Sequence, residues 1–177
     1  MGNPDRLQLS NKTKQLALFN LAIDSKLRGC DLLKLKVSDI SQNGRISSRA
    51  IILQKKTKQT VQFEITEQTR DSIAQLITDL ELRYDDYLFQ SRNKASSHLS
   101  TRQYARVVNY WVSSIGLDPA AYGTHTMRRT KATLIYKRTK NLRAVQLLLG
   151  HTKLESTVRY LGIEVDDALE ISELTEV

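Results

Sequence analysis

The sequence LLLGHTKLESTVRYL occupies residues 147–161 and contains the features that decide the expected fold of this chain. Three leucines followed by Gly150 are typical of a helix that ends at a glycine cap. This cap places His151 at the turn just beyond the helix. Tyr160 follows nine residues after His151, on a second short helix that opens at Glu155. The pattern therefore predicts two consecutive helices, with a histidine between them and a tyrosine on the second.

A further pair of polar residues lies upstream, in the sequence THTMRRTKAT that begins at Thr124. His125 and Arg128 are three residues apart on an expected helix, so both project from one face. Such a face near a helix N-terminus favours a phosphate, and the guanidinium of Arg128 can hold two of its oxygens. A solvated helix face is the ordinary interpretation of an isolated pair with this spacing. Together with His151 and Tyr160, however, the pair completes the groups needed to break and rejoin a DNA phosphodiester without metal or ATP.

The distribution of charge favours a polyanionic partner. The chain has 177 residues, a net charge of +8 and a pI near 9.6. Residues 121–160 contain nine lysines and arginines, with Glu155 as the single acidic residue. Residues 162–177 contain six acidic residues and no lysine or arginine. Because the basic segment surrounds the candidate chemistry, the charge pattern strengthens the case for nucleic acid.

Composition argues against several other classes of protein. Hydrophobic residues make up 40% and charged residues 26% of the chain, as in ordinary globular proteins. No apolar run approaches the roughly 20 residues of a membrane span, and no signal-peptide pattern opens the sequence. Cys30 is the single cysteine, which excludes an intramolecular disulfide and disfavours a thiolate metal site. We therefore expect a protein of the reducing cytoplasm, with no membrane partner and no metal.

Hydrophobic spacing predicts an α+β protein that is mostly helical, in which a small three-stranded antiparallel sheet packs with a helical bundle. The strands are expected at residues 36–40, 46–53 and 60–65, with Asn43-Gly44 as a hairpin turn and a polar turn over residues 55–59. Helices are expected from Ser10 to Ile23, after Gly29, from Thr66, from Ser100, over residues 124–137, 141–149 and 154–161, and in an acidic tail from about 164.

Residues 147–161 resemble the C-terminal signature of the tyrosine recombinases, the phage integrase family, in which such elements present a histidine and the nucleophilic tyrosine. The upstream sequence THTMRRTKAT resembles the family element H-x-L-R-H-T-x-A-T, with Arg129 where a histidine is usual. The sequence from Ser25 to Leu35 resembles the element T-G-L-R-x-x-E-L-x-x-L, with Arg28 at its arginine. The usual glycine is absent from this element, where Ser25-Lys26 stands instead.

The resemblance also predicts a catalytic lysine on the turn between the second and third strands. Lys56 best matches the family's turn, while Lys55 and Lys58 remain alternatives. The resemblance covers the chain in order from about Leu9 to Tyr160. It implies six catalytic residues: Arg28, Lys56, His125, Arg128, His151 and Tyr160.

In the mechanism that the resemblance implies, Tyr160 attacks the scissile phosphate of double-stranded DNA and forms a 3′-phosphotyrosine. The two arginines stabilise the added negative charge, the lysine protonates the leaving 5′-oxygen, and the histidines assist with protons and hydrogen bonds. No metal or nucleotide cofactor is needed, and full recombination implies a homotetramer on DNA. DNA contacts are expected from the surrounding basic residues Lys55, Lys58, Arg129, Lys131, Arg138, Arg143 and Arg159.

We expect residues 1–177 to form a single catalytic domain with a core at about 9–161, without the core-binding domain that usually precedes it in the family. The acidic segment 162–177 either docks in trans on a neighbouring protomer or is a solvated end. The expected setting is the bacterial cytoplasm, associated with the nucleoid and with a mobile element.

Two other functions use similar parts. A type IB topoisomerase forms the same 3′ adduct but only relaxes supercoils, and the spacing between Gly150 and Tyr160 favours a recombinase. An integrase-derived accessory protein would bind DNA without recombining it, and the presence of all six catalytic-type residues disfavours this alternative.

Overall fold

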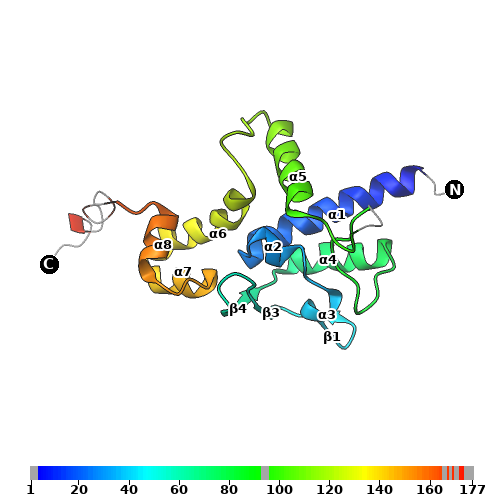
Figure 1. The fold of residues 1–177 in the computed structure, drawn as a ribbon, viewed down its shortest axis with the longest axis horizontal. Helices are drawn as coiled ribbons and strands as arrows, with labels where there is room; N and C mark the ends of the chain where they lie inside the picture. The colour runs from blue at the N-terminus through cyan, green and yellow to red at the C-terminus, as the bar shows by residue number, and fades with distance from the viewer. Residues whose placement is uncertain (1–3, 93–95, 165–166, 168, 170–171, 174–177) are drawn as a thin grey trace.

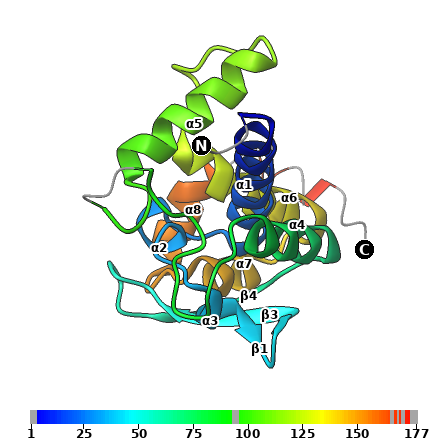
Figure 2. The ribbon, with the colours of Figure 1, turned by 90° about the vertical axis from the view of Figure 1, so that its right-hand side faces the viewer.

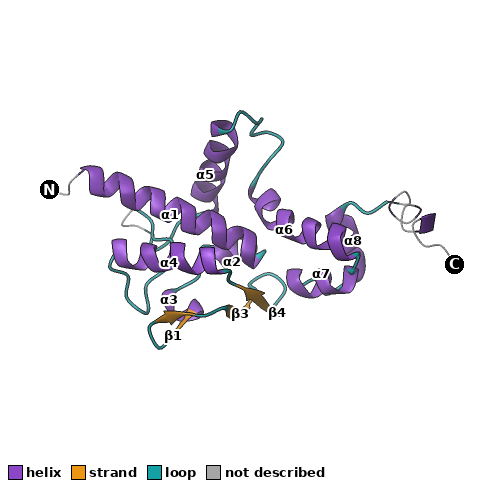
Figure 3. Ribbon diagram, turned by 180° about the vertical axis from the view of Figure 1, so that it is seen from behind, coloured by secondary structure: helices purple, strands orange, loops and turns teal. Residues whose placement is uncertain are grey.

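The computed structural model describes residues 4–92, 96–164, 167, 169 and 172–173, with side chains from residue 11 onward (Figure 1). As predicted, the chain is mostly helical with a small amount of antiparallel strand (Figure 3). Most of the acidic tail, with its expected helix, lies outside the described residues. The elements in chain order are α1 (Pro4–Ser25), α2 (Gly29–Leu32), α3 (Val37–Ile40), β1 (Ser41–Gln42), β2 (Arg45–Ile46), β3 (Arg49–Leu53), β4 (Thr60–Glu64), α4 (Glu67–Asp79), α5 (Thr101–Ser114), α6 (Thr124–Thr139), α7 (Leu142–Leu149) and α8 (Leu154–Leu161).

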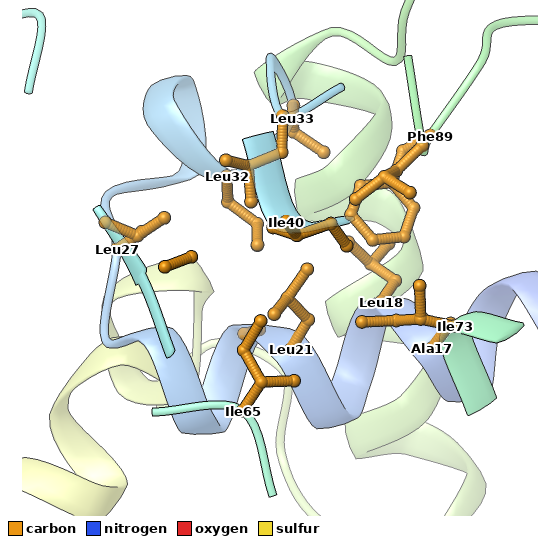
Figure 4. Close-up of a cluster of buried hydrophobic side chains, with 14 of the residues drawn as sticks. Ala17, Leu18, Leu21, Leu27, Leu32, Leu33, Ile40, Ile65, Ile73 and Phe89 are labelled. Carbon is orange, nitrogen blue, oxygen red and sulfur yellow. The ribbon is translucent and has the colours of Figure 1, made fainter. Parts of the chain in front are cut away.

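Helices α1 and α4 lie side by side (Figures 1 and 2), and both contribute buried side chains to the larger hydrophobic cluster. Helix α1 begins at Pro4, earlier than the predicted start at Ser10. Its apolar face points into a cluster that also receives side chains from α2, α3, the strands and the loop after α4 (Figure 4). Fully buried members include Leu18, Leu21 and Phe89. Helix α5 adds Tyr104 and Val108 to this cluster, and its first turn is capped as predicted by Ser100.

The strands differ from the predicted three-stranded sheet. Residues 36–40 were expected as a strand, but Val37–Ile40 is one turn of helix, because the Asp39 carboxylate accepts a hydrogen bond from the backbone N–H of Lys36 at 2.8 Å. Val37 and Ile40 are both buried, and their spacing of three places them on one face of a helical turn but on opposite faces of a strand. Both residues are β-branched and favour a strand, and this preference is the reason for the wrong prediction.

The remaining strands form two antiparallel hairpins within the described part of the chain. Strands β1 and β2 pair across the predicted Asn43-Gly44 turn, and β3 pairs with β4 over five residue pairs. The predicted strand over residues 46–53 is interrupted at Ser47-Ser48, which separates the two hairpins. The β3–β4 hairpin lies against α7 and presents the turn over residues 54–59 beside it.

Helices α6, α7 and α8 surround a second, smaller hydrophobic cluster at the opposite end of the molecule from the start of α1 (Figure 1). Their bounds lie within two residues of the predicted ones. Asn141 caps α7 through a hydrogen bond that its side chain accepts from the N–H of Ala144. The cluster consists of Ala132, Tyr136, Val145, Leu149 and Leu161. The candidate site residues lie where this smaller cluster meets the larger one.

Candidate active site

Gly150 sets the turn that carries the first candidate histidine. Its φ of +63° ends α7 in the left-handed conformation that glycine adopts without strain. A Cβ at this position would lie 2.4 Å from Cγ1 of Val61 and 2.9 Å from Oε1 of Gln54. The glycine is therefore needed both for the backbone conformation and for the close approach of α7 to the β3–β4 hairpin. The next residue, His151, leaves the turn toward α8.

His151 is held by α8. Its Nδ1 lies 3.0 Å from the hydroxyl oxygen of Thr157, which is fully buried one turn before Tyr160. The imidazole packs edge-on against the Tyr160 ring, with 5.4 Å between the ring centroids. Burial, together with the positive charges of Arg128 and Arg28, lowers the pKa of His151 to about 4. At neutral pH this side chain is therefore an uncharged imidazole.

Tyr160 lies between His151 and the guanidinium of Arg128. Its ring centroid is 5.5 Å from Cζ of Arg128, and its hydroxyl donates a 3.4 Å hydrogen bond to the backbone carbonyl oxygen of His125. Burial raises the pKa of Tyr160, although neighbouring arginine charges oppose the shift. The phenol is therefore protonated at rest, and attack on a phosphate requires that the proton be removed.

Arg128 is the most deeply buried of the six candidate residues, with 3% of its surface exposed. Its Nη2 donates to the carbonyl oxygen of Leu149 at 2.7 Å, while its buried Nε has no hydrogen-bond partner among the described residues. Burial lowers the pKa of Arg128 to about 10, and the charge of Arg28 acts in the same direction. Arg128 is therefore a cation at neutral pH with unused donor capacity, as expected of a group that binds an anion.

Arg28 reaches the same site from the larger cluster, because it occupies the N-cap position of α2. Its Nη1 donates to Oε1 of Gln54 at 2.6 Å, and Nε2 of Gln54 donates to the Leu149 carbonyl oxygen at 3.2 Å. The Leu149 carbonyl thus accepts hydrogen bonds from both Arg128 and Gln54. The two arginines, which are distant in sequence, are joined through one glutamine side chain and one carbonyl oxygen.

Two supporting residues were missed by sequence reasoning. Gln54 is completely buried, and nothing in the local sequence distinguishes it from other polar residues before a turn. Thr157 could have been identified from the sequence, because the spacing T-x-x-Y places it one helical turn before Tyr160 on the same face. Asp31 accepts a 2.9 Å hydrogen bond from the backbone N–H of Lys55, at the start of the turn between β3 and β4.

The other two predicted catalytic residues are exposed. His125 contributes its backbone carbonyl to the Tyr160 hydroxyl, while its side chain is exposed near the start of α6. Lys56 is exposed on the β3–β4 turn, two residues from Gln54. No hydrogen bond or ion pair joins Lys56 to the other five within the described ranges. The choice among Lys55, Lys56 and Lys58 therefore stays a prediction.

The position of Lys131 differs from the one that its predicted contact with DNA requires. Its Nζ donates to Oδ1 of Asp24 and to Oε1 of Glu64, both at 2.7 Å. These ion pairs direct the ammonium into the protein, so its placement does not support the prediction that Lys131 contacts DNA. The other six predicted DNA-contacting residues are all exposed: Lys55, Lys58, Arg129, Arg138, Arg143 and Arg159.

Two further observations concern ligands and membranes. Across the described ranges, no group of three or more His, Cys, Asp or Glu side chains is arranged to hold a metal ion. None of the helices in the same ranges combines the length and the apolar character needed to cross a membrane.

The fold and the clustered side chains define a class of protein. A tyrosine packed between a buried arginine and an uncharged histidine, with a second arginine linked to the first, is the arrangement expected in the catalytic domain of a tyrosine recombinase. The family model described as "Phage integrase family" matches residues 3–165. The chain belongs to the phage integrase family.

Individual relatives agree with this membership. The "Probable integrase/recombinase YoeC" of Bacillus subtilis is 31% identical over 159 residues, which are 89% of this chain and 83% of YoeC. The "Tyrosine recombinase XerH" of Campylobacter jejuni is 25% identical over 160 residues, which are 89% of this chain and 43% of XerH. The chain therefore spans most of YoeC but less than half of this XerH.

Solved structures share the fold. The XerH site-specific recombinase bound to difH substrate in a pre-cleavage complex has a TM-score of 0.73 at 22% identity, with 95% of this chain and 48% of that chain covered. The XerA recombinase has a TM-score of 0.72 at 19% identity, with 98% and 62% covered. Both the predicted family and the predicted fold class are confirmed.

Proposed function

We propose that this chain is the catalytic domain of a site-specific recombinase that cuts and rejoins double-stranded DNA through a 3′-phosphotyrosyl intermediate. The observation that carries the proposal is the packing of Tyr160 between His151 and Arg128, with Arg28 joined to Arg128 through Gln54 and the Leu149 carbonyl. Support also comes from the relatives, which are named as recombinases, and from a structural neighbour described as bound to its DNA substrate.

In the cleavage step the phenolic oxygen of Tyr160 bonds to the scissile phosphorus, and the bond from phosphorus to the 5′-oxygen breaks. The products are a 3′-phosphotyrosyl enzyme and a free 5′-hydroxyl. Arg28 and Arg128 donate hydrogen bonds to the nonbridging oxygens, where negative charge accumulates in the transition state. Because the adduct retains the energy of the phosphodiester, a 5′-hydroxyl of another strand can attack it and release Tyr160 without a nucleotide cofactor.

The uncharged state of His151 suits a hydrogen-bonding role. When its Nδ1 accepts from the Thr157 hydroxyl, the proton lies on Nε2, which can donate to a nonbridging oxygen. The proton for the leaving 5′-oxygen comes from Lys56, the role that the family resemblance implies for a lysine on this turn. His125 accepts the proton of Tyr160, and this requires its exposed side chain to turn toward the phenol when DNA is bound.

The wider assembly follows from the chemistry. Each protomer supplies one tyrosine and a recombination event cuts four strands, so we propose a homotetramer on DNA. The exposed basic residues Lys55, Lys58, Arg129, Arg138, Arg143 and Arg159 contact the phosphate backbone. The protein acts at the nucleoid on a mobile element.

The proposal is tested by trapping the covalent adduct. The protein is incubated with end-labelled duplexes taken from the DNA on either side of its gene, denatured in detergent and separated by electrophoresis. We expect label to migrate with wild-type protein and with Tyr110→Phe, which alters an exposed tyrosine on α5, and not with Tyr160→Phe.

The outcomes separate the alternatives. An adduct that persists in Tyr160→Phe would contradict the assignment of the nucleophile. DNA retained in a native gel without any adduct would favour the accessory DNA-binding protein instead. An adduct together with relaxation of a supercoiled plasmid that lacks a recombination site would favour the type IB topoisomerase.

A further inference from the structure

Four charged side chains, two buried and two partly exposed, form a cluster where the two hydrophobic clusters meet, outside the site described above. Asp24 belongs to the last turn of α1, and Lys26 lies in the turn that follows. Glu64 is the last residue of β4, and Lys131 lies in the middle of α6. The cluster contains two carboxylates and two ammonium groups, so its charge is balanced. It joins three elements that are far apart in sequence.

The hydrogen bonds within this cluster are short, and each ammonium group contacts more than one acceptor. Nζ of Lys26 donates to both carboxylate oxygens of Glu64 at 2.9 and 3.1 Å, and to the backbone carbonyl oxygen of Asp24 at 2.5 Å. Nζ of Lys131 donates to Asp24 and to Glu64, each at 2.7 Å. The remaining carboxylate oxygen of Asp24 accepts three hydrogen bonds from the first turn of α4 and its cap, from Thr66 and Thr69. Each carboxylate therefore accepts hydrogen bonds from more than one residue.

The burial of Lys26 shows how strongly this cluster constrains the chain. Its side chain is 0% exposed, which is rare for lysine unless the ammonium is paired. Its φ of +54° lies in the left-handed region, which is strained for a residue with a Cβ. Burial lowers the pKa of Lys26, although Glu64 opposes the shift. A lysine at this position carries both a backbone and a desolvation cost, and the contacts with Glu64 and Asp24 offset them.

The cluster is adjacent in sequence to both phosphate-binding arginines. Lys26 is two residues before Arg28, and Lys131 is three residues after Arg128 on the same helix. Burial alone would lower the pKa of Lys131, but its hydrogen bonds with Asp24 and Glu64 outweigh burial and raise it. The ion pairs of Lys131 therefore attach α6, which carries Arg128, to the turn that leads into Arg28.

We propose that Asp24, Lys26, Glu64 and Lys131 form a positioning cluster that sets the distance between Arg28 and Arg128. Directional ion pairs determine spacing more sharply than apolar contacts, which tolerate sliding. The cluster does not touch the substrate, so its members are positioning residues. The consequence for cleavage rests on the proposed recombinase function, whereas the spacing of the arginines does not.

The first test needs no DNA, because the pKa of His151 depends on its burial and on the nearby charges of Arg128 and Arg28. The pKa is measured by NMR titration of the three histidines, and the His151 resonance is identified with His151→Gln. In Lys131→Met we expect the pKa of His151 to rise by about half a unit or more, since the charges of Arg28 and Arg128 withdraw from it. Lys131→Arg keeps the ion pairs and should restore the wild-type value.

A matched control distinguishes this effect from the loss of any lysine. Lys12→Met removes an exposed lysine from α1, the helix that carries Asp24, and should leave the pKa of His151 unchanged. An unchanged pKa of His151 in a folded Lys131→Met protein overturns the proposal, even where the melting temperature falls. If Lys131→Met does not fold, Glu64→Gln replaces the carboxylate by a neutral group of the same shape and should produce the same rise.

The second test measures adduct formation at saturating DNA. We expect the rate to fall by about tenfold in Lys131→Met, because a small misplacement of a catalytic group is costly, while the dissociation constant for DNA changes by less than about threefold. The combined variant Lys131→Met/Glu64→Gln should lose less than the product of the two single losses, since both remove one interaction. Equal losses in rate and affinity would instead indicate that Lys131 binds DNA. If the wild-type protein forms no adduct, the recombinase proposal is refuted. The histidine titration still tests whether the cluster sets the distance between Arg28 and Arg128.

Discussion

The two hydrophobic clusters of this molecule differ in size and in the kind of residue that they present. Among the described residues, the larger cluster has 22 buried members from α1 to α6, and the smaller one has five from α6 to α8. Of the four residues gathered at the site, Arg128 and Tyr160 lie on α6 and α8, and His151 lies in the turn between α7 and α8, all in the smaller region, whereas Arg28 comes from the larger one. The comparison indicates that one region is mainly a scaffold and the other mainly carries the chemistry.

The boundary between the two regions is largely polar. Gln54 bonds to the Leu149 carbonyl across it, and Lys131 pairs with Asp24 and Glu64. Met127 adds an apolar contact, because it packs the start of α6 against the larger cluster. An active site divided between two regions depends on such directional contacts for its geometry, and the predictions below examine that division.

Truncation of each cluster should have the largest effect and should separate the two regions. Leu21→Ala and Leu149→Ala each remove a fully buried side chain and should lower the free energy of unfolding by about 2–5 kcal/mol. Hydrogen exchange followed by mass spectrometry should show faster exchange in both regions for Leu21→Ala. For Leu149→Ala the increase should be confined to α6, α7 and α8, because the smaller region opens by itself. Faster exchange throughout the chain in both variants would show that the molecule unfolds as one unit.

Replacement of Arg128 should separate function from stability at the boundary. Arg128→Met should slow adduct formation by about 10²–10³-fold, since one group that stabilises the transition state is lost. The melting temperature should stay the same or rise, because a buried cation with an unpartnered Nε is replaced by an apolar chain. The Leu149 carbonyl keeps its hydrogen bond from Gln54. A large fall in stability would instead make Arg128 part of the scaffold.

Gly150→Ala should move the two regions apart. The new Cβ would meet Val61 and Gln54 and would adopt an unfavourable positive φ, so we expect a loss of about 1–3 kcal/mol in the free energy of unfolding. Gly116→Ala is the matched control, because its φ is also positive but its Cβ would meet nothing within 4 Å. The difference between the two variants in urea unfolding measures the close packing alone. Equal losses would mean that α7 can shift without cost.

Local patterns predicted the helices of the smaller region well, because their ends are marked by residues with one structural meaning. Gly150 ends α7 in the left-handed conformation, and Asn141 caps the start of the same helix. The motif spacings also identified His151, Arg128 and Tyr160, which the fold brings together. These residues are either close in sequence or part of a family signature.

Contacts between distant segments could not be predicted in this way. Lys131 has the same local surroundings as a solvated lysine, and its structural role comes from its pairing with Glu64 and with Asp24, which is 107 residues earlier. Gln54 is similar, since its partner Leu149 is 95 residues away. The prediction for Val37–Ile40 was wrong for a different reason, because a segment of four residues is too short for its sequence pattern to separate a helical turn from a strand.

The smallest predicted effect concerns the pH dependence of stability in the smaller region. The folded pKa of His151 is about 4, below the value of about 6.5 expected in the unfolded chain. Between these values the unfolded chain binds more protons than the folded one, so the free energy of unfolding rises with pH across this window. The contribution of His151 is complete above pH 6.5 and is lost progressively as the pH falls toward 4.

Urea unfolding at pH 7 and pH 4.5 measures this contribution. The wild-type protein should lose about 1–2 kcal/mol more on acidification than His151→Gln does, a modest value because the imidazole is partly exposed and screened by solvent. Hydrogen exchange at pH 4.5 should show the loss first in α6, α7 and α8, since protonation disrupts the packing of His151 against Tyr160. Equal losses in both proteins would mean that the folded pKa of His151 stays near its unfolded value, and that burial and the two arginine charges do not disfavour the protonated imidazole.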